Sequence, residues 1–247
     1  MTTTFLINTL RVISIIIEWS YSFYKKDTTY STRGAVGNIL RGLTNRFIQD
    51  SFFFFFFLWV GITSATFSKI TILPLLACVL SLDFLGYVLH TFNHRVPLLW
   101  VFHSVHHSDD KVNLTTGYRV SWLEQTYSFI VILPILLLIG FNINTIIVSV
   151  YIISTHSFLS HINYVQLPKF FSYIIVTPQT HRIHHDENIE NQNSNYGNLF
   201  SIWDRMFGTF KQTYTPLKFG IKGYHQDNFI KMETDPIITY IKNIIKK

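Results

Sequence analysis

The chain has 247 residues, of which 48% are hydrophobic, 17% aromatic and only 14% charged. A soluble domain usually carries about a quarter charged residues, so this composition argues against a water-soluble globular protein and for a membrane protein. The formal net charge of +6 would also suit a nucleic-acid-binding protein, but the basic residues flank apolar segments, which is typical of the cytoplasmic ends of membrane helices.

Five apolar segments predict helices. In chain order they span residues 4–21, 51–67, 70–89, 125–141 and 143–159. Arg11 and Glu18 interrupt the first segment, which for that reason does not resemble a cleavable signal peptide. Several segments are shorter than the roughly 20 residues that cross a bilayer, so some are expected to be tilted or half-buried. The predicted fold class is an all-α integral membrane protein with four to five transmembrane or membrane-buried helices.

Charge predicts how these helices are oriented in the membrane. Five basic residues lie between the first and second segments: Lys25, Lys26, Arg33, Arg41 and Arg46. The turn near Lys69 carries one basic residue, and the turn at 140–142 carries none. Because positively charged loops stay in the cytoplasm, each helical hairpin is expected to run outward and return. Residues 101–124 and 161–247 would then form a cytosolic helical cap, on the cytoplasmic face of a bacterial inner membrane or the endoplasmic reticulum.

The polar C-terminal part of the chain is predicted to consist of short helices and loops. Pro168 and Pro178 interrupt it, and glycines follow. Its last stretch, residues 236–247, carries five isoleucines and three lysines. This composition fits a basic helix that lies in the membrane interface, and equally an ordinary terminal helix that packs on the cap.

Ten of the eleven histidines lie between residues 90 and 185, and most of them have the spacing of metal ligands. One HxxxH motif and two HxxHH motifs contain His90, His94, His103, His106, His107, His181, His184 and His185. Positions i, i+3 and i+4 share one face of a helix, so each motif can direct two or three imidazoles to one point. A single histidine could be a hydrogen-bonded core residue, but three such motifs in one chain make that alternative weak.

The number of histidines predicts two metal ions. Imidazole binds iron and zinc well, and one ion takes roughly four to six ligands. Cys78 is the single cysteine and lies in an apolar stretch, so the ligands are expected to be imidazoles. A pair of iron ions suits the activation of dioxygen beside a lipid chain. Zinc, the alternative metal, has no redox chemistry.

Four segments around these motifs resemble the fatty acid hydroxylase superfamily, also called the sterol desaturase family, of integral-membrane di-iron oxygenases. They read DFLGYVLHTFNH (83–94), PLLWVFHSVHHSDDKVNLTTGYR (97–119), LSHINYVQLPKFFSYIIVTPQTHRIHH (159–185) and NSNYGNLFSIWDRMFGTF (193–210). The resemblance implies an oxygen-dependent hydroxylase or desaturase with two non-haem iron ions. Its substrate would be a lipid, such as a fatty acyl chain, a sterol, a sphingoid base or an ether lipid.

The chain departs from the common pattern of the superfamily in two places. Thr91 stands where many members have arginine, and residues 120–124 lack the usual histidine–proline pair. The sequence of residues 120–124, together with residues 113–116 before it, resembles the alkylglycerol monooxygenase-like branch of the superfamily. The chain has no GxGxxG dinucleotide fingerprint, so electrons are expected from a separate donor of the cytochrome b5, ferredoxin or reductase type.

The resemblance also assigns a ninth ligand. His161 precedes Asn163 and lies 20 residues before His181, as the isolated ligand of the superfamily does. His156 is expected in the core or beside the ligands. His225 lies outside every motif and is expected on the surface.

Three further residues are candidates for holding the ligands in place. Asp83 lies seven residues before His90, on the same helix face. It is expected either to hold a ligating imidazole by its free N–H or to be solvated at the membrane boundary. Asn195 and Tyr196 are expected either to orient ligands or only to form the turn that Gly197 completes.

We expect one membrane domain over residues 1–247. Its parts are an N-terminal helix and basic segment (1–50), a helical hairpin (51–89), a fatty acid hydroxylase-like catalytic region (83–210) and a C-terminal tail (211–247).

Two alternatives to an oxygenase are a membrane metal-binding or transport protein and a catalytically silent relative. The first would need polar residues through the middle of the apolar segments, where they are scarce. The second is expected to have lost ligands, and none of the eight motif histidines is missing.

Overall fold

A computed structural model of the chain describes residues 2–60, 70–212, 217–221 and 229–245. Within these ranges the regular structure is helical, and the one extended pairing is an isolated bridge between Ile175 and Phe200. The predicted all-α fold class is therefore confirmed.

The helices follow the chain in a simple order. They are α1 (Thr2–Lys25), α2 (Thr32–Val60), α3 (Ile72–Arg95), α4 (Pro97–His107), η1 (Leu114–Tyr118), α5 (Trp122–Ile139), α6 (Ile143–Leu159), η2 (Lys169–Tyr173), α7 (Pro178–His184), α8 (Ile189–Gln192), α9 (Ile202–Met206) and α10 (Phe229–Ile245). The five apolar segments of the sequence correspond to α1, α2, α3, α5 and α6.

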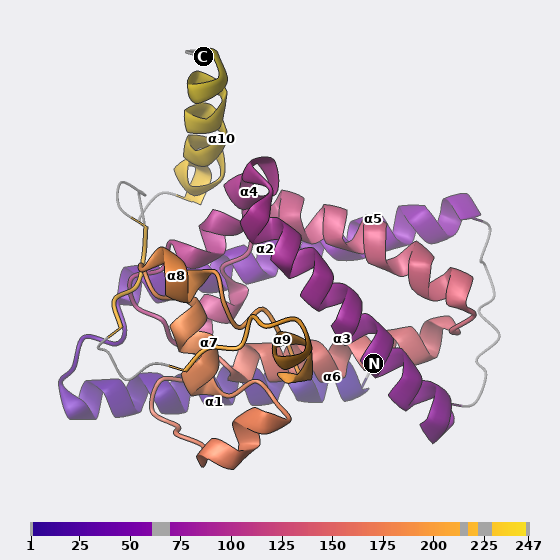
Figure 1. The fold of residues 1–247 in the computed structure, drawn as a ribbon, viewed down its shortest axis with the longest axis horizontal. Coiled ribbons are helices and arrows are strands. Elements are labelled where there is room, and N and C mark those ends of the chain that lie inside the picture. The colour runs from indigo at the N-terminus through magenta and orange to yellow at the C-terminus, as the bar shows by residue number, and fades with distance from the viewer. Residues whose placement is uncertain (1, 61–69, 213–216, 222–228, 246–247) are drawn as a thin grey trace.

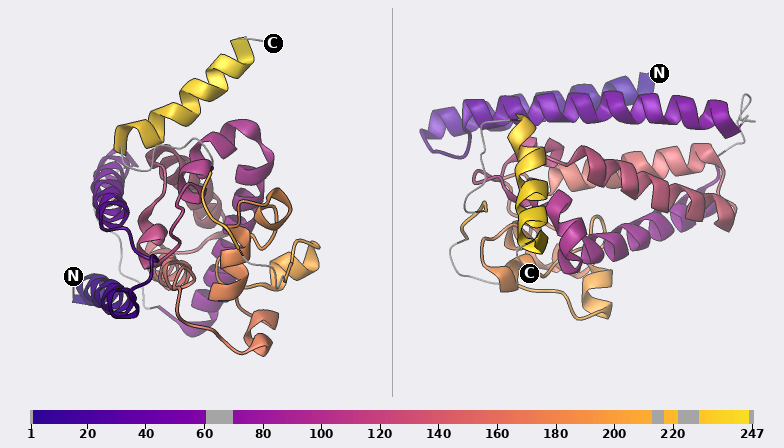
Figure 2. Two further views of the ribbon diagram at one scale, coloured as in Figure 1. Left: turned by 90° about the vertical axis from the view of Figure 1, so that its left-hand side faces the viewer. Right: turned by 90° about the horizontal axis from the view of Figure 1, so that it is seen from above.

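Helices α1, α2, α5 and α6 run broadly along one direction, and α3 crosses them obliquely to complete a bundle (Figures 1 and 2). The short elements α4, α7 and α8 gather at the end of the bundle where α3 passes into α4. The turn between α1 and α2 lies at that same end, whereas the turn between α5 and α6 lies at the opposite end. The bundle thus has one end rich in short elements and one end closed by a tight, uncharged turn.

Among the residues that the structure describes, two helices, α3 and α5, are long and apolar enough to cross a membrane, and α6 is a shorter apolar helix. Buried residues from all three form a small core, namely Cys78, Leu82, Leu133, Leu136 and Ile146. Large apolar side chains also point outward from these helices; Leu138 on α5 is 87% exposed. An outer surface of this kind is costly in water but favourable in lipid.

Helix α2 begins at Thr32, nearly twenty residues before the predicted start at residue 51, and the last part of that prediction lies outside the described residues. The basic segment is therefore mainly helical. Its inward face is polar, with Asn38, Arg41 and Asn45 buried one or two turns apart, while Leu43 and Phe47 are exposed. Hydropathy alone could not find this helix, because its polar face packs inward and its apolar face points outward. Arg41 is a structural residue rather than a charge at the membrane edge.

The two charges that interrupt the apolar sequence of α1 attach that helix to the bundle. Arg11 donates from Nη2 to the hydroxyls of Ser154 and Thr155 on α6, at 2.9 and 3.0 Å. The buried carboxylate of Glu18 accepts from the backbone N–H groups of Leu114 and Asn163, at 2.9 and 2.6 Å. Both charges therefore have a packing role that the sequence did not reveal.

The C-terminal helix α10 begins at Phe229 rather than at Pro236. Its first turns pack on α4, and Glu233 is buried against the start of α5. There Glu233 accepts from the Ser121 hydroxyl at 2.8 Å and from the Trp122 N–H at 3.3 Å, and it forms an ion pair with Arg41. This packing involves residues that precede the stretch 236–247, apart from Pro236, and the second half of α10 projects from the body (Figure 1).

The Arg41–Glu233 pair gives a test of how α10 is attached. Removing one partner of a buried ion pair costs about 3–5 kcal/mol, whereas replacing both by apolar residues is often neutral. Glu233→Ala is therefore expected to lower the free energy of unfolding by about 3 kcal/mol, and the double variant Arg41→Met/Glu233→Leu by much less. Denaturant unfolding in detergent measures both. Equal losses in the two variants would show that the ion pair is not what holds α10 in place.

Candidate metal centre

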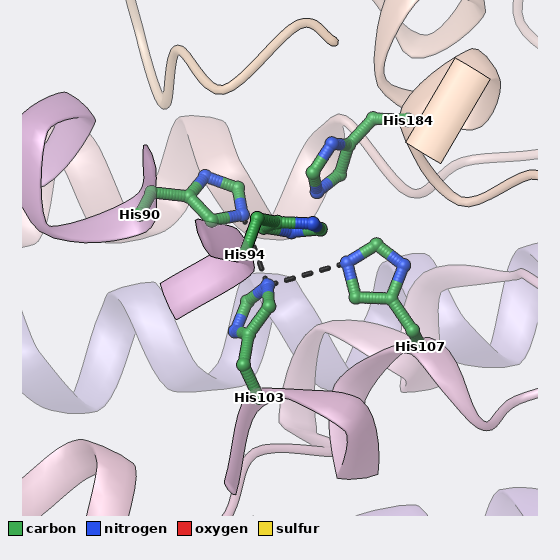
Figure 3. Close-up of side chains that lie close together, drawn as sticks. All are labelled: His90, His94, His103, His107 and His184. Carbon is green, nitrogen blue, oxygen red and sulfur yellow. Dashed lines mark hydrogen bonds between the residues drawn. The ribbon is translucent and has the colours of Figure 1, made fainter. Parts of the chain in front are cut away.

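The structure brings the nine predicted histidines together at the end of the bundle that carries the short elements. Their ring nitrogens fall into two groups, and within each group they lie within 4.8 Å of one another. The five-histidine group contains His90, His94, His103, His107 and His184. The four-histidine group contains His106, His161, His181 and His185. Figure 3 shows the rings of the five-histidine group directed at a common point.

Each HxxHH motif divides its histidines between the two groups. On α4, His103 and His107 lie one turn apart and join the five-histidine group, while His106 joins the other. On α7 and its C-terminal cap the division is reversed: His184 joins the five-histidine group, and the pair His181 and His185 joins the four-histidine group. Both groups therefore need α4 and α7 at once.

The distances between ring nitrogens match those between ligands of one ion. In the five-histidine group the Nε2 atom of His103 lies 3.0 Å from that of His90 and 3.2 Å from that of His107. In the four-histidine group the Nε2 atoms of His161 and His181 are 3.1 Å apart. Ligands at about 2.1 Å from a metal and about 90–110° apart would be separated by roughly 3.0–3.4 Å.

Several buried ring nitrogens have no hydrogen-bond partner. They include Nε2 of His184 and both nitrogens of His94. A buried polar atom without a partner is costly, and such atoms are rare in native structures. A metal ion bound at each group would satisfy the inward-facing nitrogens, so the residues present fit a two-metal centre.

Backbone carbonyls fix the orientation of four rings. His90 donates from Nδ1 to the Tyr196 carbonyl at 2.8 Å, and His184 donates to the Ser194 carbonyl at 2.7 Å. His106 and His161 bind the carbonyls of Arg119 and Ser157 in the same way, at 3.1 and 2.8 Å. A carbonyl only accepts, so each Nδ1 must carry the proton, and Nε2 is left with its lone pair directed into the centre.

Burial favours the neutral form of six of these histidines. Burial in the first place, and neighbouring imidazoles in the second, hold the pKa values of five rings well below the ordinary value, namely those of His106, His107, His181, His184 and His185. Burial also lowers the pKa of His161 to about 4. Neutral imidazole is the form that binds a metal.

A fifth ring is oriented by a carboxylate that the sequence analysis did not select. His103 donates from Nδ1 to Glu124 Oε1 at 2.7 Å, and Asn93 donates to the same oxygen at 3.1 Å. Tyr127 in turn donates to Asn93 at 2.8 Å. In the part of the chain that the structure describes, Glu124 is the one carboxylate that contacts the nine histidines. A lone acidic residue in the first turn of an apolar helix was the available signal.

The prediction for Asp83 was wrong in both of its forms. Asp83 is fully buried, so it is not a solvated boundary residue, and it contacts no histidine. Its carboxylate accepts from the N–H groups of Leu199 and Phe200 and from the Trp203 indole, at 2.8–3.0 Å. Two helical turns rise about 10 Å, which is too far for a carboxylate to reach the ring of His90. Asp83 instead fastens the segment that follows Tyr196 to α3.

Both predicted roles of residues 195 and 196 are present. Tyr196 orients His90 through its backbone carbonyl, and its buried ring packs on His90, His94 and His184, with centroids 5.1–5.7 Å apart. Asn195 has a positive φ of 53°, and its side chain bridges the backbones of Thr180 and Lys211. Asn195 therefore forms the turn that positions the Tyr196 carbonyl.

The other two histidines lie outside both groups or outside the described residues. His156 is half-buried on α6 and makes a hydrogen bond from Nδ1 to the Asn198 carbonyl at 2.9 Å. His156 was expected either in the core or beside the ligands, and this contact with the backbone fits a role in the core. His225 lies outside the described residues.

Comparison with known proteins places this centre in a family. The model of the fatty acid hydroxylase family matches residues 75–209, which contain all nine histidines. Alkylglycerol monooxygenase from Danio rerio is 36% identical over 131 residues, which are 53% of this chain and 29% of that protein. The Xenopus tropicalis enzyme of the same name is 33% identical over 131 residues, with the same coverage.

A bacterial protein, ornithine lipid hydroxylase from Rhizobium tropici, is 26% identical over 152 residues, which are 61% of this chain and 46% of that protein. The chain spans less than a third of the length of the alkylglycerol monooxygenases that it matches. No solved structure shows a significant match to the chain.

The contact between Glu124 and His103 predicts a specific effect on metal binding. Outer partners of ligating histidines typically contribute 10–100-fold to metal affinity. Glu124→Ala is therefore expected to weaken metal retention about 10–100-fold. Glu124→Gln keeps an oxygen that accepts from Nδ1 and is expected to lose much less. Metal content after dialysis against a graded chelator measures both, with the exposed Asp110→Ala as a control. Normal retention in Glu124→Ala would exclude the positioning role.

Proposed function

Because the chain belongs to the fatty acid hydroxylase family, we propose that it is a membrane-bound, oxygen-dependent lipid hydroxylase or desaturase whose nine buried histidines bind two iron ions. The observation that carries this proposal is the convergence of these histidines into groups of five and four, each with buried ring nitrogens that have no protein partner. Dioxygen and a lipid are the substrates, and a separate protein supplies the electrons.

The ligand set supports iron over zinc. Both groups consist entirely of imidazoles, which bind either metal. Structural zinc is almost always four-coordinate, with a closed tetrahedral shell, and a group of five histidines exceeds that number. When bound, iron supplies the oxygen activation and C–H oxidation that zinc, lacking redox chemistry, does not. The protein itself orients the rings through carbonyls and Glu124, and it excludes water with the aromatic side chains of Tyr196 and Trp100, which pack on the ligands.

The position of the centre supports a lipid substrate. His90 and His94 lie in the last turns of α3, one of the two helices that can cross a membrane. The reacting carbon of an acyl or alkyl chain can therefore approach the metals from the apolar side of the bundle without entering water. The chain's own contribution to catalysis would be to hold that carbon beside the centre.

The names of the relatives direct the choice of lipid to test first. Alkylglycerol monooxygenases from several animals are 28–36% identical to the chain over its matched part, so ether lipids are the first candidate. Residues 113–116 are part of the segment that resembles the alkylglycerol monooxygenase-like branch. In the structure they form a buried turn at η1, which Asn113 caps. Because they are buried in this turn, these residues are evidence for a relationship to that branch, and they are not evidence for contact with a particular substrate.

The charge distribution supports a cytoplasmic active site in a multi-pass protein. Lys25, Lys26 and Arg33 are exposed at the turn between α1 and α2, which lies at the same end of the bundle as the histidines (Figure 1). The turn at 140–142 carries no charge and lies at the opposite end. The positive-inside rule then orients the histidines toward the cytoplasm, where a soluble or membrane-attached electron donor can reach them.

The proposed two-metal centre predicts how many iron ions the chain binds, and it predicts that damage to either histidine group removes one of them. Purified protein reconstituted with ferrous iron is expected to bind about two ions. His106→Ala, in the four-histidine group, and His184→Ala, in the five-histidine group, are each expected to lower this to about one and to abolish turnover. His156→Ala removes a half-buried histidine outside both groups and is expected to keep two, as is His225→Ala. Metal analysis and circular dichroism of the same samples check this. A stoichiometry well below one in folded wild-type protein would exclude the two-metal centre.

The lipid proposal predicts a defined mass change. Cells that express the wild-type chain are expected to contain a lipid heavier by one oxygen, or lighter by two hydrogens, compared with cells that express His184→Ala. Lipid mass spectrometry with added alkylglycerol ether lipids measures this change and distinguishes hydroxylation from desaturation. Identical lipid profiles under aerobic conditions, with a competent electron donor present and both metals bound, would contradict the oxygenase function.

A further inference from the structure

Helix α10 runs across the direction of the bundle. Figure 1 and both views in Figure 2 show its axis roughly perpendicular to α1, α2, α5 and α6, beside the end of the bundle that holds the histidines, while α3 runs obliquely between these two directions. Helices α3 and α5 cross the membrane in the proposed arrangement. A helix that lies at a right angle to α5, at the level where α5 begins, therefore lies roughly parallel to the membrane plane.

One side of α10 is accounted for by packing. Met232, Glu233 and Pro236 are buried, and α10 contacts α4. Glu233 binds Arg41 of α2 and the first residues of α5. The helix is therefore held in place by its first two turns, and its remaining turns extend beyond the rest of the protein (Figure 2).

The projecting part carries an apolar stripe that nothing in the described chain covers. At 100° per residue, the isoleucines of α10 fall within an arc of roughly 120° that adjoins the buried side. Its exposed members there are Ile238, Ile241, Ile244 and Ile245. Ile241 is 48% exposed and Ile245 is 77% exposed. Lys231, Asp235 and Lys242 lie just beyond the far edge of this arc.

The order of residues around the helix indicates what covers the stripe. Lysines that flank an apolar face are characteristic of helices that lie in the membrane interface, because the ammonium groups extend to anionic headgroups while the apolar face enters the acyl region. We propose that α10 lies in the interface of the same bilayer that α3 and α5 cross, with its isoleucine stripe in lipid and Lys242 at the headgroups. This inference rests on the proposed membrane insertion, and it does not depend on oxygenase activity.

The consequence is a fixed depth for the metal centre. Glu233 joins α10 to Ser121 and Trp122, which lie two to three residues before Glu124. Glu124 in turn holds His103. A helix that rests on the bilayer surface is thus connected by three contacts to a ligand of the five-histidine group, and it determines how far below the headgroups the histidines lie.

Site-directed spin labelling of the full-length protein in lipid nanodiscs tests the proposal. In a Cys78→Ser background, single cysteines replace Ile241 and Ile245 on the stripe, and Asp235 and Lys242 beyond it. Leu138→Cys on α5 serves as the lipid-exposed control, and Asp110→Cys as the aqueous control. Labels at 241 and 245 are expected to be accessible to oxygen, which concentrates in lipid, and protected from a water-soluble nickel complex. Labels at 235 and 242 are expected to show the reverse pattern.

The controls separate the possible failures. If labels at 241 and 245 are as accessible to nickel as the label at 110 while the label at 138 is protected, α10 lies in water and the proposal is overturned. If the label at 138 is also accessible to nickel, the membrane insertion on which the proposal rests is wrong. If the label at 241 is protected from both reagents, and its spectrum is broadened by labels on other molecules, a second copy of the chain covers the stripe. That result would also overturn the proposal. Metal content of each variant, measured in parallel, confirms that the centre is intact.

Discussion

The structure depends on one constraint, the burial of nine imidazoles at a single place. Each ring must direct one nitrogen inward, and a partner for its other nitrogen lowers the cost of burial, because a buried polar atom without a partner is costly. Four carbonyls and Glu124 satisfy outer nitrogens. Most of these carbonyls lie in irregular segments, so those segments must be held firmly. Asp83 and Asp204 do this by accepting backbone N–H groups between residues 196 and 200.

The peripheral helices follow from the same constraint. The centre needs polar neighbours, and α1 and α2 supply them from their inward faces, while their apolar residues point outward. Asn38 illustrates this arrangement: it accepts from Arg119, whose own carbonyl orients His106, and it donates to Asp109. Such a helix is unfavourable in water and favourable in a bilayer, where the outer solvent is itself apolar. The low charge content of the chain and its buried polar residues therefore have one explanation.

Much of this could be predicted from the sequence, and the exceptions have physical reasons. The apolar helices and the gathering of the histidines follow from periodicity and spacing, which are local properties. The start of α2 could not be found, because its buried face is polar and its partners lie far away in the chain. The true partners of Asp83, more than a hundred residues distant, and the role of Glu124 depend on packing between helices. The division of each HxxHH motif between two groups depends on how α4 and α7 are rotated, and spacing alone does not determine that.

This division has a consequence for how the protein matures. Neither group can form on one helix, because α4 supplies two histidines to one group and one to the other, and α7 does the opposite. An ion captured by either group must draw α4 and α7 into the same relative position that the other group requires. Since binding free energy spent on ordering the first group need not be spent again on the second, two ions bound in the proposed centre would assist each other's capture. Metal loading would thereby act as a check on assembly, because a chain in which the two helices have not docked would retain neither ion.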